Sequence, residues 1–405
     1  MKHKEKYMLI ICWVTYLVAY MCRVNMASAL PRLETAFSAD AGHWGLTGSL
    51  YFFVYACGQL INGILGDRVN PYRYVAVASA GAMGMNLIVS FSSNVGVILV
   101  CWTLNGYFQS MFWGPMLRIL AFSYPESENG KVSVWMSISY IMGYIFSWVV
   151  VGSILSGSVW NLYFLVPAVC MLPVFIVWTV LYFRKRHITL PQPRDSLKKS
   201  LSLRGILKTI SEEKLQMVVI VCICTGLIRE SISLWLPVIM LKALGFDYKS
   251  SPLMLAIIPL ANLGGIVFAR RLFRRFTGDI MKALILLASL LAGGCALLFI
   301  FNGASGFADI TMIAFISAMT FGCGSLLLAN IPLSFSHKNI VSTLVGIFDF
   351  SSYIGAAIAA FVLGLVLSGD SWTFIPVIWL LVAIVAVVFL WSYSRKTKAS
   401  KASKV

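Results

Sequence analysis

Residues 20–31 read YMCRVNMASALP and place Arg23 inside an otherwise apolar segment. Residues 7–22 are apolar or aromatic apart from one threonine, and residues 24–31 are small or apolar apart from one asparagine and one serine. An apolar segment of about 20 residues is long enough to cross a bilayer as a helix. A charged side chain inside such a helix is costly and is rarely kept without a task. The segment therefore predicts a transmembrane helix that carries a functional arginine.

The composition of the whole chain is that of a membrane protein. Of 405 residues, 59% are hydrophobic and 12% are charged, whereas a soluble domain has about 25% charged residues. We expect an all-α polytopic membrane protein with twelve transmembrane helices in two six-helix bundles. The predicted helices are 7–30, 44–66, 74–92, 96–122, 132–156, 161–183, 215–241, 251–269, 280–302, 308–334, 341–367 and 372–394.

The net charge of +17 follows from the expected topology. Of the 32 Lys and Arg residues, all but six lie on the side of the membrane that holds both termini. By the positive-inside rule that side is the cytoplasm, so we expect a multi-pass protein of the cell inner (plasma) membrane with cytoplasmic termini. The expected surroundings are a lipid bilayer, whose anionic headgroups attract such residues, and we expect no nucleic-acid partner. The six exceptions are Arg32, Lys242 and Lys249 on the other side and Arg23, Arg118 and Arg229 within helices.

The sequence gives no sign of catalysis. All nine cysteines lie inside predicted helices, so neither a disulfide framework nor a metal site is expected. No histidine lies within a predicted helix, and we find neither a nucleophile paired with a base nor a glycine-rich phosphate loop. We therefore expect no enzyme and no cofactor.

The chain divides into two halves that repeat one another. The hydrophilic segment 184–214 is predicted to be a cytoplasmic linker between bundles 1–183 and 215–405, with a short amphipathic helix at 201–210. Arg23 precedes a proline by eight residues, and Arg229 does so at the equivalent place in the second half. Repeats of this kind place the substrate near the middle of the membrane, between the halves.

The two buried arginines indicate an anionic substrate. Each lies within roughly 10 Å of the middle of its helix, at 1.5 Å per residue. A long side chain near a helix end can reach the interface, which is the interpretation we favour for Arg118. For Arg23 and Arg229, at matching positions, we prefer two cations that face a central pathway. Two guanidinium groups suit a phosphate-like dianion better than a carboxylate, because each donates two parallel hydrogen bonds.

Helix 2 ends in GILGDR, residues 63–68, and helix 8 in GIVFAR, residues 265–270. The first pattern resembles the cytoplasmic signature of the major facilitator superfamily, and we expect Asp67 and Arg68 to act in conformational change. Within that superfamily the chain resembles the organophosphate:phosphate antiporters, such as bacterial glycerol-3-phosphate and hexose-6-phosphate transporters. The matching residues are Tyr20, Arg23, Asn25, Ala27, Ala29, Pro31 and Leu33; Gly106, Phe108, Gln109, Met111, Trp113, Pro115 and Arg118; 132–135; Leu227, Arg229, Trp235 and Pro237; and Gly346, Tyr353 and Gly355.

The resemblance implies roles for individual residues. Arg23 and Arg229 would bind phosphate. Glycerol-3-phosphate transporters have a lysine where this chain has Gln59, and a histidine where it has Ser139, next to Tyr140. The further candidates for substrate binding are Tyr16, Tyr20, Gln59, Gln109, Trp113 and Tyr140.

Two acids within the helices are a departure from these relatives. Glu230 either pairs with another helix or joins Asp349 in proton coupling or in secondary contacts with the substrate, together with Tyr353. Asp349 is the stronger candidate, because glycines and Tyr353 give its helix a tightly packed register. We therefore expect a monomeric transporter of a small organic anion, a phosphate ester or phosphonate, with inorganic phosphate or a proton as coupling species. The alternatives are a proton-coupled carboxylate (sugar acid) symporter and a transporter-like membrane sensor of a phosphorylated metabolite.

Overall fold

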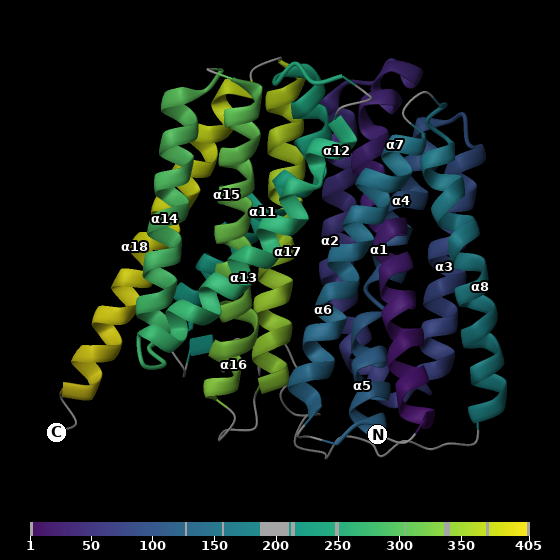
Figure 1. The fold of residues 1–405 in the computed structure, drawn as a ribbon, viewed down its shortest axis with the longest axis horizontal. Helices are drawn as coiled ribbons and strands as arrows, with labels where there is room; N and C mark the ends of the chain where they lie inside the picture. The colour runs from purple at the N-terminus through teal and green to yellow at the C-terminus, as the bar shows by residue number, and fades with distance from the viewer. Residues whose placement is uncertain are drawn as a thin grey trace. The chain divides into compact units, whose positions relative to one another are not determined.

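The computed structural model shows that the described residues are mostly helical (Figure 1). Most of the predicted linker, including the predicted amphipathic helix, lies outside the described residues. The structure describes residues 3–125, 128–155, 158–186, 210–211, 215–247, 251–303, 305–335, 341–369 and 372–402.

The chain forms two compact units. The first contains Met1–Pro193 together with Asp247–Pro259, and the second contains Arg194–Phe246 and Leu260–Val405. Residues 247–259 belong to the first unit because the short helix α12 packs against its η2 and α7 segments. A Cβ atom on Gly152 of α7 would lie 3.3 Å from Pro252 of α12, so the two segments are in close contact.

In the first unit α1 packs against α6 and α8, α3 packs between α4 and α8, and α2 packs on α4. Figure 1 shows these helices side by side. Their bounds are α1 His3–Phe37, α2 Ala41–Arg68, α3 Pro71–Phe91, α4 Val95–Gln109, α5 Trp113–Ser123, α6 Asn129–Ile145, the π-helix η2 Phe146–Val151, α7 Gly152–Ile154, α8 Leu162–Lys185 and α12 Ser251–Leu255.

In the second unit α11 packs against α15, α17 and α18, and α14 packs against α15 and α18. The bounds are α11 Gln216–Lys242, α13 Ile257–Arg275, α14 Ile280–Phe301, α15 Gly306–Ser325, the π-helix η3 Leu326–Asn330, α16 Ile331–Ser334, α17 Val341–Ser368, the short 3₁₀-helix η5 Trp372–Phe374 and α18 Ile375–Ala402.

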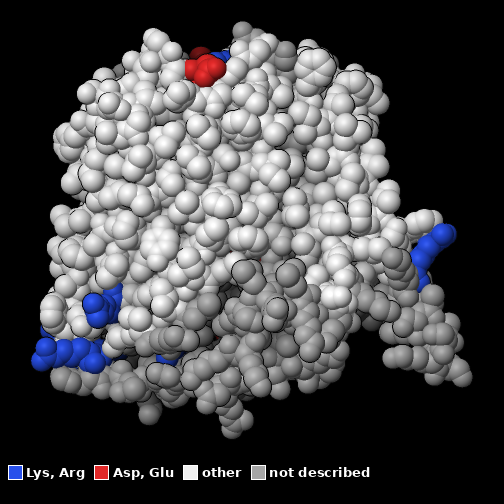
Figure 2. Space-filling model, turned by 180° about the vertical axis from the view of Figure 1, so that it is seen from behind, with Lys and Arg blue, Asp and Glu red and all other residues white. Residues whose placement is uncertain are grey.

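The helices have the length and surface of membrane spans. Eleven helical segments among the described residues are long and apolar enough to cross a bilayer. The second predicted span corresponds to α2, which is 28 residues long. On the face drawn in Figure 2 the described charged residues lie near helix ends, and the middle is uncharged. Large apolar side chains such as Phe91 and Ile154 are more than 70% exposed, as expected for a surface in contact with lipid.

The first helix ends later than predicted. The first helix does not stop before Pro31 but continues to Phe37, and Thr35 donates a hydrogen bond to the Pro31 carbonyl. Proline is tolerated inside membrane helices because neighbouring groups satisfy the backbone that it frees. Pro237 likewise lies inside α11.

The fourth helix of each half is interrupted, which the apolar pattern did not predict. In the first unit the predicted span 96–122 is split into α4 and α5 at residues 110–112. In the second unit α15 passes into the π-helix η3 before α16. Irregular turns of this kind often mark functional sites in membrane helices. The first interruption directly follows the candidate residue Gln109.

The internal repeat is visible in the packing of the arginine helices. A Cβ atom on Gly143 of α6 would lie 2.8 Å from the carbonyl oxygen of Leu17, and one on Gly355 of α17 would overlap that of Ile223. Leu17 and Ile223 each precede the arginine of their helix by six residues. In both units a glycine thus allows a neighbouring helix to approach the arginine-bearing helix at the same place.

Candidate functional site

The first unit surrounds Arg23 with aromatic rings. Arg23 is on α1 and is 7% exposed. Its guanidinium carbon lies 5.1 Å from the centre of the Tyr20 ring and 4.5 Å from that of Tyr55, on α2. A guanidinium group over an aromatic face gains about 0.5–2 kcal/mol, more when desolvated. The rings therefore offset part of the cost of burying the charge.

Further rings extend this cluster along α1. Tyr16 lies 5.0 Å from Tyr20 and 4.9 Å from Trp113, measured between ring centres. Tyr20 also lies 5.4 Å from Tyr140 and 5.5 Å from Tyr144, both on α6. The structure thus brings the predicted residues Tyr16, Tyr20, Trp113 and Tyr140 into one cluster of rings, of which Tyr20 lies next to Arg23.

The two candidate glutamines play different parts. Gln59 Nε2 donates to the Tyr55 hydroxyl at 2.7 Å, so it holds a ring that lies over Arg23. Gln109 is 5% exposed and its Nε2 donates to the carbonyl oxygen of Ala19, which joins α4 to α1. Gln59 belongs to the arginine cluster, whereas the observed contact of Gln109 is one between helices.

An asparagine cluster fixes α1 next to Arg23. Asn25 Nδ2 donates to Asn86 Oδ1 at 2.8 Å and to the Tyr163 carbonyl at 3.0 Å. The carbonyl of Cys22 accepts from Asn86 and from Asn105. Amide hydrogen bonds of this kind join α1 to α3, α4 and α8, so the position of Arg23 is set by three neighbouring helices.

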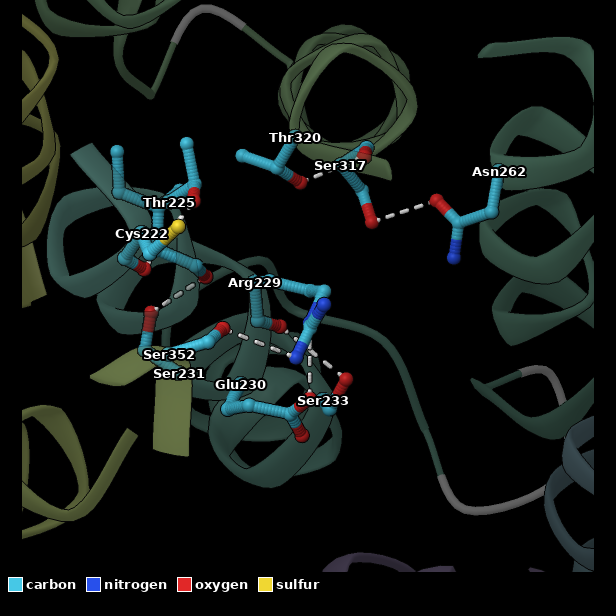
Figure 3. Close-up of polar contacts among 11 residues, drawn as sticks. Cys222, Thr225, Arg229, Glu230, Ser231, Ser233, Asn262, Ser317, Thr320 and Ser352 are labelled. Atoms are coloured by element: carbon cyan, nitrogen blue, oxygen red, sulfur yellow. Dashed lines mark hydrogen bonds and ion pairs between the residues drawn. The ribbon is translucent and has the colours of Figure 1, made fainter. Parts of the chain in front are cut away.

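The second unit holds Arg229 by polar groups (Figure 3). Arg229 Nε forms an ion pair with Oε1 of Glu230, the next residue on α11, at 2.9 Å. Its Nη2 donates to the hydroxyl of Ser352, on α17, at 3.3 Å. The rings of Phe321 and Tyr353 lie 5.8 and 5.7 Å from the guanidinium carbon. The ion-pair partner of Glu230 is therefore Arg229, on the same helix.

The other predicted acid, Asp349, is half-buried on α17, one turn before Tyr353. Asp349 and Arg229 are both close enough to Cys222 to interact with it electrostatically. Tyr353 is 6% exposed and contacts Arg229 through its ring. The structure thus gathers Arg229, Glu230, Asp349 and Tyr353 in one region of the second unit.

A neighbouring polar contact ties two helices of this region together. Ser317 of α15 donates to Asn262 Oδ1 of α13 at 2.7 Å, and Thr320 donates to the Ser317 carbonyl. Figure 3 shows these side chains near Arg229. A Cβ atom on Gly265 would overlap the Ala318 carbonyl, so α13 and α15 are in very close contact.

Sequence reasoning missed several residues of these clusters. Tyr55 precedes Gln59 by one helical turn, and Tyr144 follows Tyr140 by one turn, so a search for i, i+4 neighbours would have found both. Ser352 is adjacent to Tyr353 and could have been found in the same way. Phe321 comes from α15, and no local pattern marks it.

The remaining sequence predictions concern Asp67 and Arg68, the cysteines and metal binding. The side chains of Asp67 and Arg68 are not among those that the structure describes, so their conformational role stays a prediction. All nine cysteines are free thiols. Within the described ranges no three His, Cys, Asp or Glu side chains come together as metal ligands.

Comparisons with known proteins agree with this architecture. The chain is 23% identical over 415 residues to a probable hexose phosphate transport protein of Chlamydia muridarum, covering 94% of this chain and 90% of that protein. It is 25% identical over 407 residues to the glycerol-3-phosphate transporter of Bacillus subtilis, covering 93% and 89%. It is 23% identical over 410 residues to the membrane sensor protein UhpC of Escherichia coli, covering 96% and 92%.

Solved structures and a family model give the same assignment. A bacterial homologue of the human lysosomal transporter Spinster, in its inward-facing and occupied conformation, matches with a TM-score of 0.76 at 13% identity, over 98% of both chains. The three relatives match the organophosphate:phosphate antiporter family, and none is an enzyme by its name. The model of the Major Facilitator Superfamily matches residues 12–360. The chain is therefore a multi-pass membrane protein that belongs to the Major Facilitator Superfamily.

Proposed function

We propose that the protein is a secondary active transporter of a small organic anion, a phosphate ester or phosphonate. The observation that carries this proposal is the pair of arginines at matching repeat positions, the buried Arg23 among tyrosine rings and the half-buried Arg229 beside Ser352. A guanidinium group donates parallel hydrogen bonds to phosphate oxygens, and buried sites strengthen such bonds. The names of the relatives, which include hexose phosphate and glycerol-3-phosphate transporters, support the same class of substrate.

The proposed mechanism is alternating access. The bundles 1–183 and 215–405 rock about one central site, and the linker 184–214 joins them in the cytoplasm. Both termini lie in the cytoplasm, and the protein works as a monomer in the inner membrane. The basic ends of α8, Arg184 and Lys185, and of α13, Arg274 and Arg275, support this orientation.

The test is uptake by proteoliposomes that contain the purified protein. Vesicles loaded with inorganic phosphate are supplied with labelled glycerol 3-phosphate, glucose 6-phosphate, a phosphonate or gluconate. We expect uptake of at least one phosphate compound and little uptake of gluconate. Loading with phosphate should accelerate uptake if phosphate is the counter-substrate, and an inward proton gradient should do so if a proton is coupled. Transport of gluconate alone would replace this proposal by the carboxylate symporter.

A sensor is the second candidate, and the similarity to UhpC supports it. A sensor binds the phosphorylated ligand without moving it at a useful rate. Binding of a phosphate ester to the purified protein, with no uptake by the same preparation in vesicles, would favour this function over transport.

A further inference from the structure

The ion pair of the second unit is not explained by anion transport alone. Arg229 and Glu230 are neighbours on α11 and are in contact at 2.9 Å. Their side chains are 11% and 6% exposed, so both charges are shielded from water. An arginine that already holds a buried carboxylate has its charge compensated before any substrate arrives.

The carboxylate takes the edge of the guanidinium group that an anion would use. Nε and Nη2 form the edge whose two N–H bonds point in parallel, which is the geometry for bidentate binding of phosphate or carboxylate. Glu230 accepts from Nε, and the Ser352 hydroxyl accepts from Nη2 (Figure 3). A substrate anion that binds this edge must displace Glu230. The displaced carboxylate would then be a buried charge without its partner, which is costly.

A role as a tie between helices does not fit this pair. Both partners lie on α11, so the ion pair itself joins no two helices, and the link from Arg229 to α17 is the separate hydrogen bond to Ser352. Other contacts join α11 to its neighbours. Gly226 lies close to Ser352 and Gly355 close to Ile223, which joins α11 to α17. A hydrogen bond from Trp379 to Ser231 joins α11 to α18. The carboxylate of Glu230 is therefore available for a different task.

We propose that Glu230 is a proton-binding residue and an internal competitor for the substrate anion at Arg229. When Glu230 is ionised, its carboxylate holds Nε. When it binds a proton from the water on the open side, the neutral acid releases Nε and the substrate anion takes its place. One negative group replaces another beside Arg229, so a proton and an anion bind together. This inference rests on the proposed function, because it requires that Arg229 binds the transported anion.

Other titratable groups lie in the same region. Asp349 and Tyr353 are on α17, Cys222 is on α11, and Cys323 of α15 precedes Gly324, whose Cβ would lie 3.5 Å from Arg229 Nη1. Glu230 is the better candidate than Asp349, because it is buried whereas Asp349 is half-buried. Neutralising the more deeply buried acid saves more desolvation energy when the anion arrives.

The experiment measures anion binding and proton uptake in the same titration. Calorimetry of the full-length protein in buffers of different ionisation enthalpy, from mildly acidic to mildly alkaline pH, gives the affinity and the number of protons taken up per anion. The probes are inorganic phosphate, glycerol 3-phosphate and gluconate. Comparison of Glu230→Gln with the wild type removes the titration of the probe itself, since it is common to both proteins.

We expect Glu230→Gln to take up about one proton fewer per anion than the wild type under alkaline conditions. Without the competing carboxylate, its affinity at alkaline pH should rise about tenfold or more, since a hydrogen bond to a charged group is worth that much. Glu230→Asp keeps an acid at this position and should keep proton uptake with a shifted pH profile. If Glu230→Gln fails to insert into the membrane, Glu230→Asp replaces it in the test. A pH profile of Glu230→Asp that equals the wild-type profile then counts against the proposal.

The matched control is Asp309→Asn. Asp309 is a buried acid of the same unit, and its Oδ2 accepts from the Gly303 amide. It precedes Gly324 by fifteen residues on α15, or about 22 Å at 1.5 Å per residue. Its replacement should leave proton uptake and the pH profile as in the wild type. A loss equal to that of Glu230→Gln would show a general effect of removing buried acids and would overturn the assignment to Glu230.

The outcomes separate the two proposals. If the phosphate probes bind with equal proton uptake in wild type and Glu230→Gln, the proposed function stands and the proton role of Glu230 is wrong. If only gluconate binds, with proton uptake that depends on Glu230, the competitor role is supported and the phosphate substrate is wrong. Binding of none of the probes contradicts both.

Discussion

The two arginines within the helices are stabilised in different ways. An isolated charge in the middle of a membrane helix costs at least about 2.5–3.5 kcal/mol. Arg23 offsets this cost with the faces of Tyr20 and Tyr55, whereas Arg229 does so with the carboxylate of Glu230 and the hydroxyl of Ser352. Equivalent residues of the repeat have thus acquired unlike surroundings, which makes the proposed anion site chemically asymmetric.

Replacement of either arginine by lysine tests whether anion binding requires the planar guanidinium group and not only its positive charge. Arg23→Lys and Arg229→Lys keep the charge but lose the parallel donors, so anion affinity should fall roughly 10–150-fold, as for one lost hydrogen bond to a charged group. Direct binding measurements on purified variants give the answer. Arg118→Lys is the matched control, because Arg118 is half-buried in α5 and donates to the Val69 carbonyl. Unchanged affinity in Arg229→Lys would falsify a site with two guanidinium groups.

At the scale of helices, glycines decide how closely the arginine-bearing helices are approached. Gly143 lets α6 reach α1, and Gly226 and Gly355 let α11 and α17 meet backbone to backbone. Without a hydrophobic driving force between helices in lipid, small residues at contacts allow the close packing that stabilises a bundle. This packing also places Ser352 within reach of Arg229.

Gly355→Ala should destabilise the second unit. The added Cβ would overlap the carbonyl oxygen of Ile223, and overpacking of this kind costs about 1–3 kcal/mol. Thermal unfolding of the detergent-purified variant should show a lower Tm than the wild type. Gly293→Ala on α14 is the control, because its Cβ meets nothing within 4 Å. Equal Tm values for both variants would contradict the role of Gly355 in close packing.

At the scale of the whole molecule, the superfamily assignment and the repeat favour two units that move as bodies. Each unit contains one arginine cluster whose helices are fixed by contacts within that unit. The asparagine cluster fixes α1 in the first unit, and the close contact of α11 and α17 does so in the second. Rigid units of this kind can alternate between two orientations without losing the geometry of either arginine.

Labelling from the two sides of the membrane tests this motion. In a variant without the nine native cysteines, Tyr16→Cys should react with a charged, impermeant reagent from either side, depending on the ligand added. Tyr16 belongs to the ring cluster beside Arg23. Ile176→Cys on α8 is the control, since this exposed apolar position should face lipid and stay unlabelled. Reaction of Tyr16→Cys from one side only, under all ligand conditions, would argue against alternating access.

The number, order and approximate ends of the spanning helices could be predicted from the sequence. The length of an apolar run decides whether a helix can cross a bilayer, and this is a local property. The same holds for the helix starts, where Asp40, Asn70, Asn94 and Asp279 cap α2, α3, α4 and α14 with their side chains. The spacing of Arg23 and Arg229 from the following prolines likewise revealed the repeat without any coordinates.

The contacts of the candidate residues were decided only by the tertiary structure. Neighbouring positions on a helix point about 100° apart, so the order of residues alone does not pair Arg229 with Glu230, yet the two side chains, 11% and 6% exposed, meet at 2.9 Å. The Tyr55 ring reaches Arg23 from α2, and the fourth predicted helix is interrupted at residues 110–112. Both depend on how separate helices pack, and an apolar pattern read along one helix contains no information about its neighbours.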